Sequence, residues 1–157
     1  PGQSLPLDAA VNVADWNEAM HYVDEALGTC PLLSSFRGQF GGRPPFHIHN
    51  LPALVSMASG MELDADALWR IAARNRALVR AFNIRRGMTR ADEQVPEAMW
   101  PTKDAQMERK AEMERKALDA YYQFKGWGED GVPTKETLAR LDLDYVTDDF
   151  KARGLIK

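Results

Sequence analysis

The stretch DADALWRIAARNRALVRAFNIRRG, residues 64–87, has the clearest periodicity in the sequence and decides the fold class. Its apolar residues recur at the three- and four-residue spacing of an α-helix, and Gly87 supplies a stop signal. We therefore predict one long helix from Asp64 to about Arg86, at the core of a domain. Its inward face is predicted to hold Leu68, Ile71, Ala72, Leu78, Val79 and Phe82.

The segments before this helix also have helical spacing, whereas alternation of polar and apolar residues is nearly absent. We expect a first helix that begins at Asp15, is capped there with the help of Glu18 three residues on, and ends at Gly28. The Gly- and Pro-rich residues 34–45 are predicted to form an irregular loop, and residues 50–60 a short helix.

The segments after it follow the same pattern. A second long helix is predicted over about residues 103–125, and the repeated MERKA within residues 107–117 is predicted to be its solvated face. Thr134 and Thr147 are each expected to cap a short terminal helix, the second ended by Gly154. The predicted fold class is therefore all-α and multihelical.

Composition limits the classes of function. The 157 residues carry a formal net charge of -3, and the sequence pI is about 5.6. This balance argues against a nucleic-acid-binding protein, because such proteins usually present a basic face. No apolar run has the roughly 18 residues that a membrane span needs, and the opening PGQSLPLDAA does not resemble a signal peptide. We expect a cytoplasmic protein.

Cys30, in the stretch EALGTC of residues 25–30, is the one cysteine of the sequence. One cysteine forms no internal disulfide, and it holds no zinc ion or iron–sulfur cluster without further ligands. From the residues alone, two interpretations stay open. Cys30 is either a small apolar side chain after a helix, or a ligand whose partners lie elsewhere.

Three ordered stretches of this sequence resemble the C-terminal region of the tungsten-dependent aldehyde ferredoxin oxidoreductase family. EALGTC is similar to the family's second D-x-x-G-L-C pterin motif. Residues 59–96 resemble the family's Arg-rich helix, its R-x-F-N-x-R-x-G signature and the R-E-D-D-x-L-P that follows. YYQFKGWGEDGVPT, which begins at residue 121, resembles Y-Y-x-x-R-G-W-x-x-x-G-x-P-T. The RADEQVP variant of residues 90–96, together with FKGW and the C-terminal DYVTDDFKARGLIK, is more similar to the branch with the tungsten subunit of class II benzoyl-CoA reductase.

The resemblance implies roles for residues 25–30. Cys30 matches the cysteine that, with three upstream cysteines, holds a 4Fe-4S cluster in this family. Glu25, Gly28 and Thr29 match positions that contact one of two pterins holding the tungsten, or molybdenum. Two residues differ from the motif. Glu25 occupies the position of the motif's aspartate, with Asp24 beside it as an alternative acceptor, and Thr29 occupies the position of its apolar residue. No catalytic residue is predicted within this chain.

The resemblance also implies the larger organisation. Residues 1–49 are expected to form the cluster and pterin-motif helix with its loop, and residues 50–157 an all-α C-terminal domain of one or two subdomains. The chain would be part of an oxidoreductase, inactive alone, that converts aldehydes and carboxylates and exchanges electrons with ferredoxin or an iron–sulfur subunit. Its partner would be an upstream domain or subunit with the remaining cysteines. Reduction of an aromatic acyl-CoA ring is the alternative reaction, and a cofactor-free helical interaction module is the alternative class.

Three further groups of residues have two interpretations each. His47 and His49 share a side if the backbone is extended, as two metal ligands would, but structural histidines are favoured. The arginines could bind phosphates or, as we favour, form ion pairs on a solvated side. The aromatic residues are expected in core and interface. The arginines are Arg70, Arg74, Arg76, Arg80, Arg85, Arg86 and Arg90. The aromatic residues are Trp69, Phe82, Trp100, Tyr121, Tyr122 and Trp127.

Overall fold

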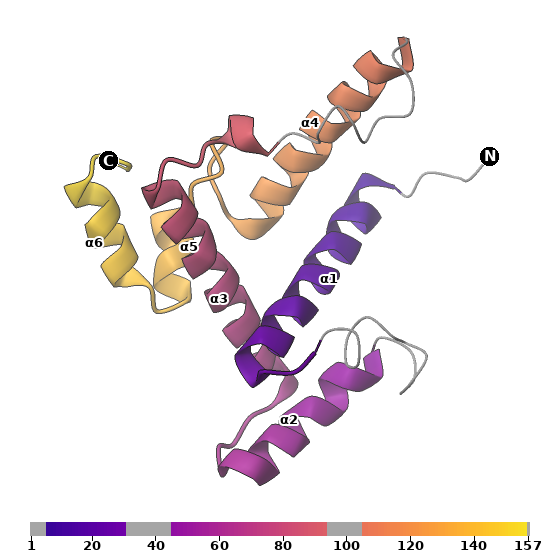
Figure 1. Ribbon diagram of the computed structural model, residues 1–157, viewed down its shortest axis with the longest axis vertical. Coiled ribbons are helices and arrows are strands. Elements are labelled where there is room, and N and C mark those ends of the chain that lie inside the picture. Colours follow the sequence, from indigo (N-terminus) through magenta and orange to yellow (C-terminus); the bar gives the residue numbers. More distant parts are fainter. Residues whose placement is uncertain (1–5, 31–44, 94–104, 157) are drawn as a thin grey trace. The chain divides into compact units, whose positions relative to one another are not determined.

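The protein is all-α, as predicted (Figure 1). The computed structural model describes residues 6–30, 45–93 and 105–156, and within these ranges it contains six α-helices, one 3-10 helix and no strand. The elements in chain order are α1 (Leu7–Leu27), α2 (Pro45–Ser59), α3 (Ala65–Arg85), η1 (Arg90–Asp92), α4 (Ala105–Lys125), α5 (Lys135–Arg140) and α6 (Asp144–Ala152).

The chain divides into two compact units. The small unit consists of residues 14–77 and the large unit of residues 1–13 and 78–157. The two long helices α1 and α3 each contribute residues to both units. The family resemblance implies a different division, into residues 1–49 and 50–157. The two compact units do not test that division, which stays a prediction.

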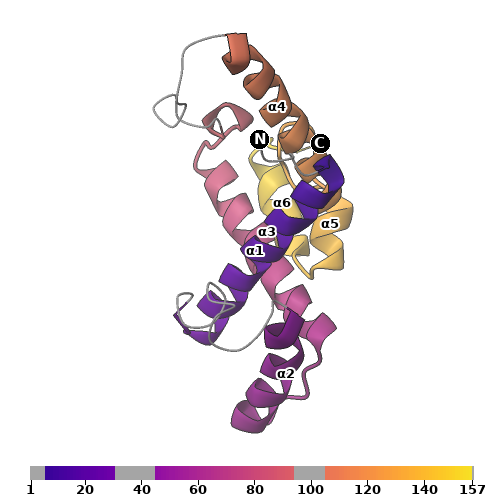
Figure 2. The ribbon, with the colours of Figure 1, turned by 90° about the vertical axis from the view of Figure 1, so that its right-hand side faces the viewer.

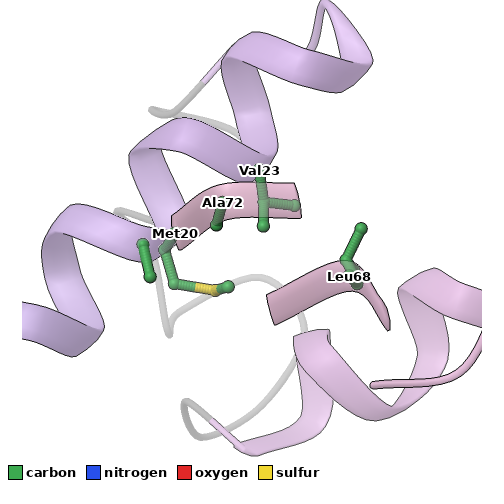
Figure 3. Close-up of a cluster of buried hydrophobic side chains, with 5 residues drawn as sticks. Met20, Val23, Leu68 and Ala72 are labelled. Atoms are coloured by element: carbon green, nitrogen blue, oxygen red, sulfur yellow. The ribbon is translucent and has the colours of Figure 1, made fainter. Parts of the chain in front are cut away.

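The core of the small unit lies between α1 and α3. Met20 and Val23 of α1 and Leu68 and Ala72 of α3 are 0–2% exposed and point toward one another (Figure 3). The partly buried side chains packed around this cluster come from the same two helices and from α2; they are Trp16, Tyr22, Leu27, Leu51 and Trp69. The prediction for the first half of the long central helix is therefore confirmed at Leu68 and Ala72, whereas Ile71 is only partly buried.

The second half of α3 turns a different face inward from the one predicted. Leu78, Val79 and Phe82 are exposed by 38–56%. The buried residues are instead the neighbouring Ala77, Arg80, Ala81 and Ile84. The sequence prediction ranked positions by hydrophobicity, but the inward face here is organised around a buried guanidinium flanked by small alanines, which leave room for partner side chains.

Two helices begin earlier than predicted. α1 starts at Leu7 and contains Asp15 in its interior. Residues 8–14 include three alanines and no Gly or Pro, and the Pro6 carbonyl accepts the first helical bond from the Ala10 N–H at 2.9 Å. α2 starts at Pro45 and includes Pro52. Of the predicted loop over residues 34–45, the part up to residue 44 lies outside the described residues.

The predicted starts of α3 and α5 are confirmed, whereas that of α6 is wrong. The Asp64 carboxylate accepts the Ala67 N–H at 2.8 Å, and the Thr134 hydroxyl caps α5. α6 begins at Asp144, so Thr147 lies inside the helix. Its side chain is 9% exposed, and the structure shows no hydrogen-bond partner for its hydroxyl.

Four helices end in the same hydrogen-bonded turn. After each helix a glycine has a φ between 68° and 98°, and the residue that follows donates its N–H to the carbonyl five residues earlier at 2.9–3.0 Å. This is the Schellman motif, in which glycine avoids the strain that a Cβ would introduce. The four glycines are Gly28 after α1, Gly87 after α3, Gly126 after α4 and Gly154 after α6.

The C-terminal helices α5 and α6 pack against each other (Figure 2). Their contact buries an apolar set that is 0–6% exposed: Leu138, Leu141, Leu143, Val146 and Phe150. α6 has a marked apolar side, and its opposite side carries the exposed charged residues Asp144, Asp148 and Lys151. The large unit therefore has an apolar core at its C-terminal end.

Candidate functional site

The turn that ends α1 contains three of the four residues to which the family resemblance assigns a role, and the fourth follows it directly. Gly28 has a φ of 68°, and its N–H donates to the Glu25 carbonyl at 3.3 Å. Thr29 donates its N–H to the Asp24 carbonyl at 2.9 Å. These two bonds complete the Schellman motif and fix the direction in which the chain leaves the helix. Cys30 is the first residue beyond this turn.

Glu25 and Asp24 have opposite environments although they are adjacent in the sequence. Asp24 is 2% exposed, and its Oδ1 accepts the Thr29 hydroxyl at 2.7 Å. Glu25 is exposed at the surface of α1. The carboxylate at the motif position is therefore the accessible one, and the alternative acceptor Asp24 is committed to the interior of the small unit.

The Cys30 side chain is exposed, as a ligand to a group outside this chain must be. A cluster needs four ligands, and the described residues contain no group of three or more His, Cys, Asp and Glu side chains placed to hold a metal ion. Because the sequence has one cysteine, a cluster held by four cysteines at Cys30 would take the other three from outside these 157 residues. The donor type fits, since cysteine thiolates are the usual ligands of iron–sulfur clusters.

The two C-terminal stretches of the family resemblance meet at Arg80. This side chain is 1% exposed, and its guanidinium makes three hydrogen bonds to oxygen, to the Gly131 carbonyl at 2.9 Å, the Glu93 carboxylate at 2.6 Å and the Tyr122 hydroxyl at 3.1 Å. It also lies 4.9 Å from the centre of the Trp127 ring. We call these five residues the Arg80 cluster.

Tyr122 is the second central member of the Arg80 cluster. Its hydroxyl donates to Glu93 while it accepts from Arg80, and its side chain is 1% exposed. Burial, followed by the hydrogen bond to the Glu93 carboxylate, raises the pKa of Tyr122 to about 12. Tyr122 is therefore a neutral hydrogen-bonding residue at physiological pH.

The backbone positions the remaining members. The η1 turn is held by Asp92, which accepts the Thr89 N–H at 2.8 Å and the Thr89 hydroxyl at 2.9 Å. These bonds lower the pKa of the Asp92 carboxyl. Gly131 approaches so closely that a Cβ there would lie 2.1 Å from an Arg80 nitrogen. The cluster therefore admits only glycine at this position without rearrangement.

The predicted arginine run does not form one surface. Arg80 is buried, contrary to the expectation of a solvated side, while Arg76 pairs with Glu18, Arg85 with Asp149 at 3.8 Å, and Arg90 with Asp119. Arg90 also borders an open hollow whose other lining residues are Asp119, Tyr122, Gln123, Trp127, Gly128 and Glu129. Because Asp119 neutralises Arg90 there, the hollow is a poor phosphate site.

The other sequence-level candidates have mixed outcomes. The backbone at His47 and His49 is helical and not extended, so the argument that placed both on one side no longer applies; their side chains lie outside the described residues. Tyr122 and Trp127 are buried as expected, but Phe82 is 56% exposed. Trp100 falls outside the described residues. The MERKA face is solvated where described, with the exposed pair Glu112 and Lys116 at 2.7 Å.

Comparison with known proteins identifies the family. Residues 2–143 match the family described as aldehyde ferredoxin oxidoreductase, domains 2 and 3. The chain belongs to this family. The resemblance on which residues 25–30 were interpreted is thereby confirmed at the level of family. No curated protein matches the chain. The structure also shows no helix long and apolar enough to cross a membrane among the residues it describes.

One solved structure shows how this aldehyde ferredoxin oxidoreductase domain recurs in a larger protein. It is described as the active site complex BamBC of benzoyl coenzyme A reductase in complex with 1,5-dienoyl-CoA. A chain of that complex is 46% identical, with a TM-score of 0.85 over 100% of the present chain. The match covers 23% of that chain, so the 157 residues span less than a quarter of its length.

Proposed function

We propose that this chain is the C-terminal portion of a tungsten, or molybdenum, bis-pterin oxidoreductase in which Cys30 supplies one ligand of a 4Fe-4S cluster. The observation that carries the proposal is the family match over residues 2–143, which include an exposed cysteine directly after the α1 turn. When bound, the metal–pterin group would exchange electrons with the substrate and the cluster would pass them on. Such a thiolate persists in a reducing compartment, and we place the enzyme in the cytoplasm.

The chain's own contribution is to present ligands and to shape the wall of the cofactor site. Gly28 has no heavy atom within 4 Å of the position that a Cβ would take, so this turn leaves open space for a close approach. The exposed Glu25 carboxylate can accept hydrogen bonds from the N–H groups of a pterin. Thr29 directly follows Gly28, and we assign it the third pterin contact of this turn.

The reaction is a two-electron conversion at a carbonyl compound or an aromatic ring. Oxidation of an aldehyde takes up water and releases two electrons and three protons with the carboxylate. Reduction of an aromatic acyl-CoA to a cyclic dienoyl-CoA takes up two electrons and two protons. The second reaction is favoured for this chain by the 46% identity to a benzoyl coenzyme A reductase subunit. In either case the partners are the upstream region with three cysteines and a ferredoxin-type or iron–sulfur electron carrier.

The proposal is tested on the complete enzyme by elemental analysis for tungsten, molybdenum and iron. Cys30→Ser should lower the iron content of the subunit that holds the cluster, expected to be about four per subunit in the parent, because serine is a poorer cluster ligand than cysteine. Met61→Ser, which removes sulfur from a side chain that is 54% exposed, is the matched control and should keep full iron. Full iron in Cys30→Ser would show that Cys30 is no ligand.

The substrate class is tested by two parallel assays of the same preparation. Aldehyde-dependent reduction of an artificial electron acceptor would support the first reaction. Consumption of an aromatic acyl-CoA with a strong reductant, followed by chromatography of the thioester products, would support the second. If neither assay shows turnover in a preparation that contains the metal and iron, both substrate assignments are wrong.

A further inference from the structure

The buried Asp24 carboxylate is a costly feature that the proposed function does not use. Asp24 lies in the last turn of α1, where the negative end of the helix dipole disfavours an anion, and this turn contains no basic residue. It is also buried, since its exposed fraction is 2%. A carboxylate in such a place needs hydrogen bonds that compensate its lost hydration.

Thr29 supplies hydrogen bonds to both polar groups of Asp24. Its hydroxyl donates to Oδ1 at 2.7 Å, and its N–H donates to the Asp24 carbonyl at 2.9 Å. The side-chain bond closes a second ring over the same residues, 24–29, that the Schellman bond already closes. The residue before Cys30 is thereby fastened to the helix through backbone and side chain together.

We infer that Asp24 and Thr29 form a positioning pair that fixes the direction of the Cys30 side chain, and that Asp24 is not a cofactor ligand. The inference deepens the proposed function and rests on it for the identity of the bound cluster. The two adjacent carboxylates then have different roles. The exposed Glu25 is the carboxylate available to the cofactor, and the buried Asp24 anchors the turn. The hydroxyl of Thr29, where the resemblance leads one to expect an apolar residue, is the group that makes this anchor.

The test compares Thr29→Val, which keeps the shape and removes the hydroxyl, with Thr29→Ser, which keeps the hydroxyl. The first measurement is amide hydrogen exchange of the peptide covering residues 24–30 in the metal-free form of the complete enzyme. Loss of one charge-assisted hydrogen bond should speed local opening about tenfold in Thr29→Val, and Thr29→Ser should stay close to the parent. Peptides from α4 and α6 serve as internal controls and should exchange unchanged.

The second measurement is the midpoint potential and electron paramagnetic resonance spectrum of the reduced cluster in the loaded enzyme. A loosened turn should shift the potential and broaden the spectrum in Thr29→Val, and Thr29→Ser should restore both, because cluster potentials respond to ligand orientation and nearby hydrogen bonds. Faster exchange with an unaltered potential and spectrum would overturn the positioning role, and so would unchanged exchange in Thr29→Val.

The outcomes separate this inference from the proposed function. Full iron in Cys30→Ser would refute cluster ligation, while the exchange comparison would still decide whether Thr29 anchors the turn. Conversely, loss of iron in Cys30→Ser together with unaltered exchange, potential and spectrum in Thr29→Val would uphold the ligand and overturn the positioning pair.

Discussion

Replacement of Arg80 by methionine should destabilise the large unit more than replacement of any surface arginine. Methionine keeps much of the apolar stem of Arg80 but removes the guanidinium, which makes hydrogen bonds to Gly131, Glu93 and Tyr122. The loss leaves the Gly131 carbonyl and the Glu93 carboxylate without their cationic partner. The destabilisation therefore comes chiefly from groups left behind and only in part from the contacts removed.

The magnitude follows from the burial of these groups. Removal of one partner from a buried ion pair costs about 3–5 kcal/mol in unfolding free energy. Arg80 is 1% exposed but the Glu93 side chain is 17% exposed, so water can rehydrate part of the orphaned carboxylate. We therefore expect the low end of the range, about 3 kcal/mol. Arg80→Lys should recover only part of this, because a point charge cannot replace the planar fork.

Urea unfolding followed by circular dichroism is the assay, with Arg85→Met as the matched control. Arg85 is 51% exposed and lies 3.8 Å from Asp149, so its replacement should change the unfolding free energy by less than about 1 kcal/mol. If Arg80→Met is no more destabilising than Arg85→Met, the Arg80 cluster does not hold the large unit together and the reasoning above is wrong.

Three further predictions concern the same unit. Gly131→Ala should lower the unfolding free energy by about 3 kcal/mol or more, because the added Cβ would collide with Arg80. Gly87→Ala has no neighbouring atom within 4 Å of the added Cβ and should lower it by only about 1–2 kcal/mol through backbone strain. Thermal unfolding of the two variants measures the difference. The folded pKa of Tyr122 is raised from 10.0 to about 12, so its contribution to stability is complete below pH 10 and lost as the pH rises toward 12; Tyr122→Phe should remove that slope in alkaline unfolding curves. Thr134→Ala should lower stability by about 1 kcal/mol through loss of the α5 cap, and Thr134→Ser should not.

Local signals in the sequence predicted the helices that depend on local chemistry. Glycine in the left-handed conformation ends α1, α3 and α6 where it was expected, and the Thr134 cap fixes the start of α5. The Thr147 cap was wrong, because the same residue type is also tolerated inside a helix. Nothing in the local sequence distinguishes the two situations, since the choice depends on how α6 packs against α5.

The inward face of the second half of α3 could not be read from hydrophobicity. Arg80 is the residue that a pattern of apolar positions assigns to solvent, and its burial depends on Glu93, Tyr122 and Gly131, which lie 13–51 residues away in the sequence. The candidate site at residues 25–30 was predictable only through its resemblance to a family motif. Composition and spacing left a lone cysteine with two interpretations, and the buried state of Asp24 had no sequence signal.

The Arg80 cluster also has a consequence for how the large unit opens. Its members come from α3, from the segment after η1, from α4 and from the turn before α5. If any one of these segments detached, it would leave a buried guanidinium or carboxylate unpaired. Partial opening is therefore penalised almost as heavily as complete unfolding. These segments should form a single cooperative unit, in which helices that are marginal by themselves are lost or retained together.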